Sequence, residues 1–236
     1  MNTTTPPSTA ASGPLQGRRI LVTEAQSFMG PALCQRLATQ GAEVIASEQP
    51  LQAPGAAAQV VGEAGRVDVL VANLGYPAPS TAAGAVGEAE WRDTFAALVD
   101  PLPRLLAAVL PQMQQRRAGK LLVMGSASAL RGMKRASTYS AARGAQLAWV
   151  QAVGVELAPW NIQVNAIAQN FVDNPTYFPP EVQANERFQQ RLQREVPLGR
   201  LVSADEDAQF VAYLCSPAAD CFVGQVFPLC GGWVGR

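Results

Sequence analysis

Three residues of this chain have the types and the spacing needed to remove a proton from a hydroxyl group. Tyr139 and Arg143 stand four positions apart in the stretch YSAAR, and Ser126 precedes them in the stretch GSAS. The chain contains no histidine, so a Ser-His-Asp hydrolase is excluded. Base chemistry in this protein must therefore rest on another kind of side chain.

Tyr139 is the candidate general base because a permanent positive charge is placed near it. A tyrosine has a reference pKa of about 10, so its use as a base near neutral pH requires roughly 4 kcal/mol of preference for the phenolate. A guanidinium about 4 Å away supplies about 4 kcal/mol at an effective dielectric near 20. We therefore assign Arg143 to stabilising the Tyr139 phenolate and Ser126 to donating a hydrogen bond to a substrate oxygen. Taken singly, the same residues are more often a solvated charge, a helix-surface residue and a strand cap.

These side chains act together only if the fold brings them to one place. From Arg18 onward, short apolar runs alternate with longer Ala- and Leu-rich segments, which is typical of strands joined by helical crossovers. Helices are expected at about residues 30–40, 88–115, 138–158 and 203–214. The pattern predicts an α/β protein with a single Rossmann-like, doubly wound parallel sheet and helices on both faces. Strands are expected in the stretches RRILVTEA, AEVIAS, VDVLVAN, KLLVMGSA, NIQVNAIAQ and QVFPLCG.

The carboxyl ends of the strands are where such a sheet holds its ligand. The loops TEAQSFMG, GSAS and AQNF each follow a predicted strand, so they should converge on one pocket. Tyr139 and Arg143 share a helix face and can point together at Ser126. The stretch 169–199 is rich in proline and is predicted to be a functional excursion with a short helix.

Composition limits the class of protein and partner. Of the 236 residues, 48% are hydrophobic, and 18 basic residues balance 18 acidic ones. The absence of a charged run argues against a nucleic-acid or membrane-surface partner and favours a small molecule or another copy of the chain. The four cysteines lack metal-site spacing and are expected to be reduced, in a cytoplasmic protein without a metal. Residues 1–17 are expected to be a disordered tail and residues 18–236 the catalytic domain.

The quoted motifs resemble the short-chain dehydrogenase/reductase superfamily over essentially all of residues 18–233. The similarity lies in VANLG, in GSAS before YSAAR, and in the late GQVFPLCGG. A dinucleotide site needs glycines after the first strand, but this chain has Phe28 and Met29 before its one glycine there, Gly30. Arg143 stands where the reductases have a lysine that contacts the nicotinamide ribose, and the two side chains are not equivalent.

Both departures, together with the stretch AQNFVDNPTYFPPE, resemble the halohydrin dehalogenases, which are cofactor-independent relatives of the reductases. The resemblance implies that a vicinal haloalcohol closes to an epoxide with release of halide and a proton. The reverse reaction would use halide, azide, cyanide or nitrite. It implies that Ser126, Tyr139 and Arg143 are the catalytic triad, that no cofactor is bound, and that a homotetramer forms through the helices at 88–115 and 138–158.

The same resemblance implies a halide pocket, in which QNF supplies backbone N–H groups, an amide and aromatic edges. This chain has Gln169, Phe178 and Leu74 where the family's best-known form has proline, tyrosine and aspartate, which bears on halide preference, substrate fit and proton exit. The resemblance also implies that Trp233 can reach a neighbouring subunit's pocket. The expected pocket residues are Phe28, Gln169, Asn170, Phe171 and Phe178.

Two other functions remain open from the sequence. One is an atypical NAD(P)-dependent reductase that tolerates arginine and a glycine-poor loop. Glu48 stands where a reductase places its ribose-binding acid, although without a seat for the phosphates we interpret it as a solvated loop charge. The other is a catalytically silent member that acts as a partner in a mixed oligomer. Halide release without cofactor separates the dehalogenase from both.

Overall fold

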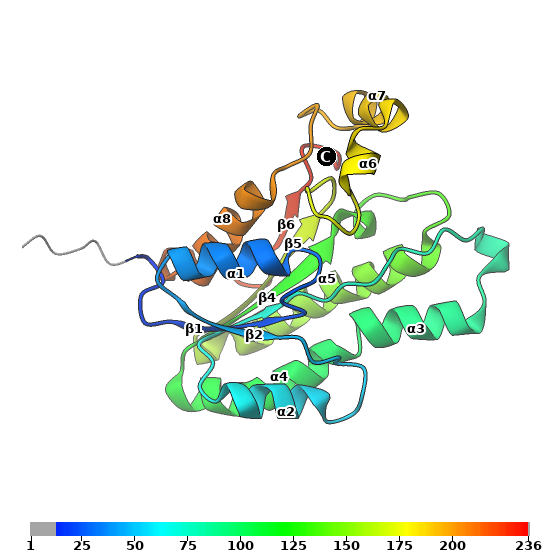
Figure 1. Cartoon of the computed structure of the whole chain (residues 1–236). Helices are drawn as coiled ribbons and strands as arrows, with labels where there is room; N and C mark the ends of the chain where they lie inside the picture. The colour runs from blue at the N-terminus through cyan, green and yellow to red at the C-terminus, as the bar shows by residue number, and fades with distance from the viewer. Residues whose placement is uncertain (1–12, 236) are drawn as a thin grey trace, which may run out of the picture.

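A six-stranded parallel sheet forms the centre of the computed structural model, which describes residues 13–235 (Figure 1). The strand order is β2-β1-β3-β4-β5-β6, so the order reverses between β1 and β3, where ligands bind in open α/β sheets. All six predicted strands and the predicted fold class are confirmed. The strands are β1 (Arg19–Thr23), β2 (Glu43–Ser47), β3 (Val69–Ala72), β4 (Gly119–Ser126), β5 (Ile162–Gln169) and β6 (Val226–Leu229).

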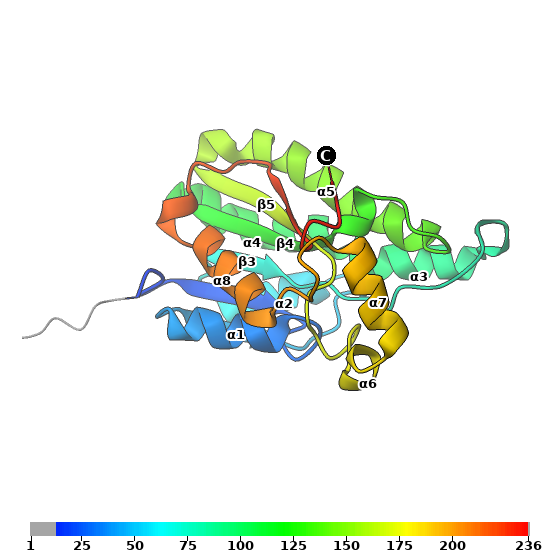
Figure 2. The same cartoon turned by 90° about the horizontal axis from the view of Figure 1, so that it is seen from above.

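Helices cover both faces of the sheet, as Figures 1 and 2 show from two directions. On one face, α1 and α8 pack together with the side chains of one hydrophobic cluster. On the other face, α2, α4 and α5 pack with a second cluster, and α3 lies on α5. Central strands with apolar residues on both sides need this double cover. The main helices are α1 (Gly30–Thr39), α2 (Ala56–Ala64), α3 (Glu88–Leu98), α4 (Pro101–Arg116), α5 (Ser137–Leu157) and α8 (Ala204–Cys215).

The helix expected over 88–115 is wrong as a single element. Pro101 begins α4 and has no N–H to donate, so it suits a helix start and ends the run of α3 hydrogen bonds. By length and composition, Glu88–Arg116 could cross a membrane, but Leu102 and Leu105 are buried against the sheet. These are therefore core helices of an α/β domain. Helix α2 was not predicted.

The proline-rich excursion folds over the carboxyl ends of the strands as a loop followed by α6 (Pro180–Gln183) and α7 (Glu186–Glu195). Asn185 caps α7, because its side-chain oxygen accepts from the N–H groups of Arg187 and Phe188. In Figure 2 this segment lies next to the beginning of α8. Two short helices thus replace the one that we expected.

The predicted tail falls mostly outside the described residues, which begin at residue 13. Within its last part, Leu15 is fully buried and its N–H donates to the carbonyl oxygen of Gln40. Packing of the domain therefore starts before Arg18.

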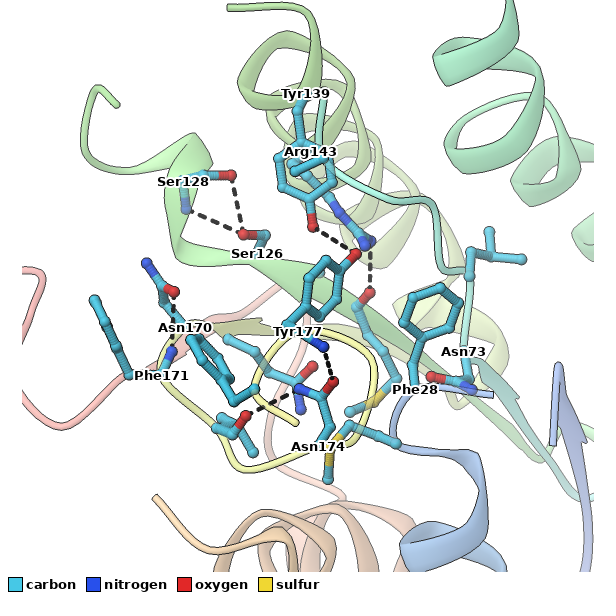
Figure 3. A pocket seen from close by; sticks show the side chains of 18 of the residues that line it. Phe28, Asn73, Ser126, Ser128, Tyr139, Arg143, Asn170, Phe171, Asn174 and Tyr177 are labelled. Atoms are coloured by element: carbon cyan, nitrogen blue, oxygen red, sulfur yellow. Dashed lines mark hydrogen bonds between the residues drawn. The ribbon is translucent and has the colours of Figure 1, made fainter. Parts of the chain in front are cut away.

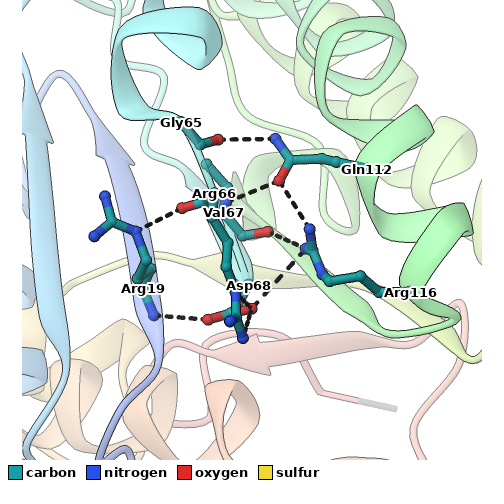
Figure 4. Close-up of polar contacts among 7 residues, drawn as sticks. All are labelled: Arg19, Gly65, Arg66, Val67, Asp68, Gln112 and Arg116. Atoms are coloured by element: carbon teal, nitrogen blue, oxygen red, sulfur yellow. Dashed lines mark hydrogen bonds and ion pairs between the residues drawn. The ribbon is translucent and has the colours of Figure 1, made fainter.

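A polar network fastens the amino ends of β1 and β3, on the side of the sheet away from these loops (Figure 4). Buried Asp68 accepts from the backbone N–H of Arg19 and from the side chain of Arg66. Gln112 of α4 accepts from Val67 N and donates to Gly65 O. The network links the amino ends of β1 and β3 to α4. The carboxyl ends of the strands, on the opposite side, remain free to form a site.

Candidate active site

One cavity of about 230 Å³ contains every residue that we predicted for the site. It lies at the carboxyl ends of β1, β3, β4 and β5, where the excursion folds back over the sheet (Figure 3). The predicted residues that line it are Ser126, Tyr139, Arg143, Phe28, Gln169, Asn170, Phe171 and Phe178, and Leu74 lines it as well.

Ser126 is the last residue of β4, and a second serine orients its hydroxyl group. The Ser126 oxygen accepts from the N–H of Ser128 at 3.2 Å and lies 2.9 Å from the Ser128 hydroxyl oxygen. When Ser128 also donates its O–H, both lone pairs of the Ser126 oxygen are used. The Ser126 O–H is then free to donate into the cavity. We did not select Ser128 from the sequence, although its position in GSAS was visible.

Tyr139 and Arg143 lie on the buried face of α5, one turn apart. The Arg143 guanidinium carbon is 5.1 Å from the centre of the Tyr139 ring. Arg143 donates to the carbonyl of Met124 at 3.0 Å and to the amide oxygen of Gln146 at 2.9 Å. Both acceptors are neutral, so the positive charge remains available to an anion in the cavity.

The charge of Arg143 persists in spite of its burial. Burial favours the neutral form, but the oxygens of Tyr139 and Tyr177 outweigh burial, and the pKa of Arg143 lies above its usual value. The guanidinium is therefore positive at every pH at which the protein is folded.

Tyr177 belongs to the same group of polar side chains and was missed in the sequence. Its hydroxyl oxygen is 3.5 Å from that of Tyr139, and it donates to the carbonyl of Tyr76 at 2.7 Å. Asn174 places it by accepting from the N–H groups of Thr176 and Tyr177. Sequence spacing offered no signal, because the excursion brings Tyr177 back to α5 only in the folded chain.

The expected donors for an anion are only partly available. The N–H of Phe171 donates to the side-chain oxygen of Asn170, and the N–H of Asn170 donates to Leu229 O. These two backbone donors of QNF were wrongly assigned to halide. The side-chain nitrogen of Asn170 remains. Gln169 lies beside Ser126 in the register of β4 and β5, but its amide nitrogen is enclosed.

Aromatic rings form the far wall of the cavity. Phe171 stacks on Phe178 at 5.9 Å between ring centres and meets the edge of Trp233, also at 5.9 Å. The guanidinium carbon of Arg191 lies 5.2 Å from the Phe171 ring centre, and the same guanidinium pairs with Glu195 at 3.1 Å. Trp233 is 3% exposed, and its side chain packs within its own chain against Phe171; its reach to a neighbouring subunit stays a prediction.

Comparisons with known proteins identify the family. A family model described as enoyl-(acyl carrier protein) reductase matches residues 47–234. A putative ketoacyl reductase of Streptomyces coelicolor is 34% identical over 185 residues, covering 74% of this chain and 70% of the relative. The chain belongs to the short-chain dehydrogenase/reductase superfamily.

Solved structures in the same fold carry dehalogenase names. A structure named dehalogenation enzyme is 32% identical, with a TM-score of 0.87 and coverage of 93% of this chain and 99% of that one. A halohydrin dehalogenase bound to ethyl (2S)-oxiran-2-ylacetate is 28% identical, with a TM-score of 0.84 and coverage of 92% and 98%. A gluconate 5-dehydrogenase of Burkholderia cenocepacia in complex with NADP and tartrate is 22% identical, with a TM-score of 0.86 and coverage of 94% and 97%. The fold of this chain is thus similar both to dehalogenases and to dehydrogenases of the superfamily.

A nicotinamide dinucleotide, which the reductases of this superfamily bind, does not fit the turn after β1. Phe28 adopts a left-handed backbone, with φ of 52°, and its ring lies across Gly75 so closely that a Cβ on Gly75 would be 1.5 Å from it. The ring fills space beside the cavity that a dinucleotide would need. The left-handed conformation costs about 1–2 kcal/mol for a non-glycine residue, so packing of the ring must hold it in place.

Polar groups of the same turn are also turned away from a phosphate. The Glu24 carboxylate accepts from Gly75 N at 2.8 Å, and burial raises its pKa against the opposing effects of that N–H and of Arg143. Asn73 donates to the carbonyls of Glu24 and Ser27. The turn therefore presents the Glu24 carboxyl group and carbonyl oxygens that already accept hydrogen bonds, whereas a pyrophosphate requires free N–H donors. Glu48, the other candidate cofactor residue, is exposed.

Proposed function

We propose that this protein is a halohydrin dehalogenase, which converts vicinal haloalcohols to epoxides with release of halide and a proton. The observation that carries the proposal is the Phe28 ring packed on Gly75. It blocks the dinucleotide seat and walls a cavity that still contains a serine, a tyrosine and an arginine. The structural likeness to two dehalogenases supports the same conclusion.

In the proposed reaction, Ser126 and Tyr139 hold the substrate hydroxyl group. The Tyr139 phenolate, stabilised by Arg143, removes the hydroxyl proton. The resulting oxygen attacks the neighbouring carbon, a C–O bond forms, and the carbon–halogen bond breaks with its electron pair leaving on the halide. Ser126 donates to the oxygen throughout, which requires no nucleophilic serine. No redox step occurs, so no hydride carrier is required.

The departing halide would collect between the aromatic wall and the amides of Gln169 and Asn170. Positive ring edges and amide N–H groups bind a weakly hydrated anion in a mostly apolar cavity. Arg191 lies over Phe171 but pairs with Glu195, so the amides and ring edges are the main partners of the anion. In the reverse direction, the same place would hold halide, azide, cyanide or nitrite for epoxide opening.

A reductase is the second candidate, and the sequence relatives are what favour it. The Streptomyces coelicolor relative is a putative ketoacyl reductase, and the matching family model describes a reductase. A reductase would have to seat its dinucleotide over Phe28 and Glu24. Calorimetric titration with NADH and with NADPH tests this function, and micromolar binding of either would replace the dehalogenase proposal.

The direct experiment incubates the purified protein with 2-bromoethanol and measures bromide and acid release without any cofactor. We expect one bromide and one proton per epoxide formed. Tyr139→Phe is the matched control, because it keeps the ring and removes only the hydroxyl group. If the wild type and this variant release bromide at the same rate, the proposal is wrong.

We also propose a cytoplasmic protein whose partners are small haloalcohols, epoxides and anions. The four cysteines are free thiols, which suits a reducing compartment.

A further inference from the structure

A buried carboxyl group lies behind the wall of the cavity. Asp207, in the first turn of α8, is fully buried, and neither of its carboxylate oxygens has a hydrogen-bond partner. The amide nitrogen of Gln169, at the end of β5, is likewise enclosed without a partner. Polar groups buried in this way are costly unless they satisfy one another.

Gln169 connects Asp207 to the cavity. Gln169 lines the cavity and pairs in register with Ser126. Its amide is also the polar side chain that acts on Asp207: burial raises the pKa of Asp207 to about 7, and the Gln169 amide opposes that rise. The Asp207 carboxyl group is therefore separated from the proposed halide position by a single amide.

Other charged groups around the start of α8 are paired among themselves. They lie on α1, on the loop before α8 and on α8 itself. None of them contributes to the shift of the Asp207 pKa, whose causes are burial and Gln169. The pairs at this end are Arg36 with Asp205 and Arg200 with Glu206, and Lys120 pairs with Asp220 at the opposite end of α8.

We propose that Asp207 and Gln169 couple anion binding in the cavity to the uptake of a proton. The proposal rests on the dehalogenase function, which puts a halide beside Gln169. When Asp207 is protonated, its O–H donates to the amide oxygen of Gln169, and the amide nitrogen turns toward the anion. When Asp207 is ionised, it accepts from that nitrogen, and the anion faces the amide oxygen with a buried negative charge behind it.

Two measurable consequences follow. Binding of each halide draws one proton from solvent onto an ionised Asp207. Halide affinity falls about tenfold per pH unit above pH 7, because only the protonated fraction of the protein binds. Asp207 and Gln169 are thus positioning residues for the anion, and they favour release of halide at alkaline pH.

Bromide binding to the full chain tests this coupling. Sodium bromide is titrated calorimetrically between pH 6 and 9 in two buffers of different protonation enthalpy, so that the proton uptake is measured directly. The parent protein carries Tyr139→Phe, which removes the hydroxyl group of the proposed base. We expect proton uptake at pH 8 and a tenfold loss of affinity per pH unit above 7.

Asp207→Asn is the decisive variant, because its amide N–H donates to Gln169 as the protonated acid does. Its bromide affinity at pH 9 should equal that at pH 6, without proton uptake. If the variant fails to fold, Gln169→Met gives the same information, since loss of the amide should weaken binding at pH 6 by about tenfold and flatten the pH dependence.

Two results would overturn the coupling. One is a parent protein that binds bromide without taking up a proton. The other is an Asp207→Asn variant that keeps the parent's pH dependence. Either result leaves the dehalogenase function standing, whereas failure of every variant to bind bromide at any pH overturns both proposals.

Discussion

The hydroxyl oxygens of Tyr139 and Tyr177 lie 3.5 Å apart, and Tyr177 donates its own proton to the carbonyl of Tyr76. Burial raises the pKa of Tyr177, Tyr139 raises it further, and Arg143 opposes both. Tyr177 therefore stays protonated, and its single O–H, which donates to the carbonyl of Tyr76 here, can turn instead to a Tyr139 phenolate.

Tyr177→Phe removes that donor and should lower kcat/KM at pH 7 by about tenfold, the effect of one hydrogen bond to a charged group. The pH of half-maximal activity should rise, because the phenolate is less well stabilised. Tyr76→Phe is the matched control, since only the backbone carbonyl of Tyr76 accepts the bond. Equal pH–rate profiles for wild type and Tyr177→Phe would show that Tyr177 only shapes the cavity.

Arg143→Met should lower dehalogenation at pH 7 by about a thousandfold, corresponding to roughly 4 kcal/mol of lost Coulomb energy. Activity should recover partly as the pH rises, because Tyr139 then ionises without help. Tyr139→Phe should be inactive at every pH, and Arg143→Lys should keep some activity. The pH dependence of kcat/KM distinguishes them, and an Arg143→Met profile of unchanged shape would refute the role of this charge.

Ser126→Ala should reduce kcat by about a hundredfold, as expected for loss of a donor to a developing oxyanion. Ser128→Ala leaves the Ser126 donor in place but frees it to rotate, so we expect a loss of only about three- to tenfold. Steady-state kinetics with 2-bromoethanol checks both variants. Losses of the same size would mean that Ser128 itself contacts the substrate.

Asp207 should make the folded protein less stable as the pH rises. Its pKa goes from 3.8 in the unfolded chain to about 7 in the fold, so the folded state holds the proton more tightly. The stabilisation is complete below pH 4 and is lost up to about pH 7, by at most roughly 4 kcal/mol. Urea unfolding should find Asp207→Asn more stable than wild type at pH 8 but not at pH 4. Asp93→Asn, at an exposed site, should show no such difference.

A homotetramer should form through α3 and α5. These helices expose Trp91 (44%) and Val155 (70%), an unusual amount of apolar surface for solvated helices. Light scattering at micromolar concentration should give four times the chain mass, and Val155→Glu should lower it. Tyr213→Glu on α8 is the control for added charge. A monomeric wild type would contradict the prediction.

Much of the fold follows from local sequence patterns. Apolar runs with aliphatic and β-branched residues, separated by helical segments, predict parallel strands and crossovers, because a strand covered on both faces has no polar alternation. Ser126 at a strand end, and Tyr139 four residues before Arg143 on a helix, could be placed together because a strand end and a helix face are both local properties. The cavity contains all three. Pro101 shows the limit of such patterns. The apolar residues on both sides of it led us to expect one helix, whereas the chain forms α3 and α4.

Contacts between distant segments were decided only by the tertiary structure. Tyr177 meets Tyr139 through a loop shaped by Asn174, and the Phe28 ring needs the space left by Gly75. In the sequence, Asp207 looks like one of several acidic residues in the first turn of a helix, where carboxylates are common. Only the packing of α8 against the sheet buries that carboxyl group near Gln169, because burial and partner choice depend on segments that are distant in the sequence.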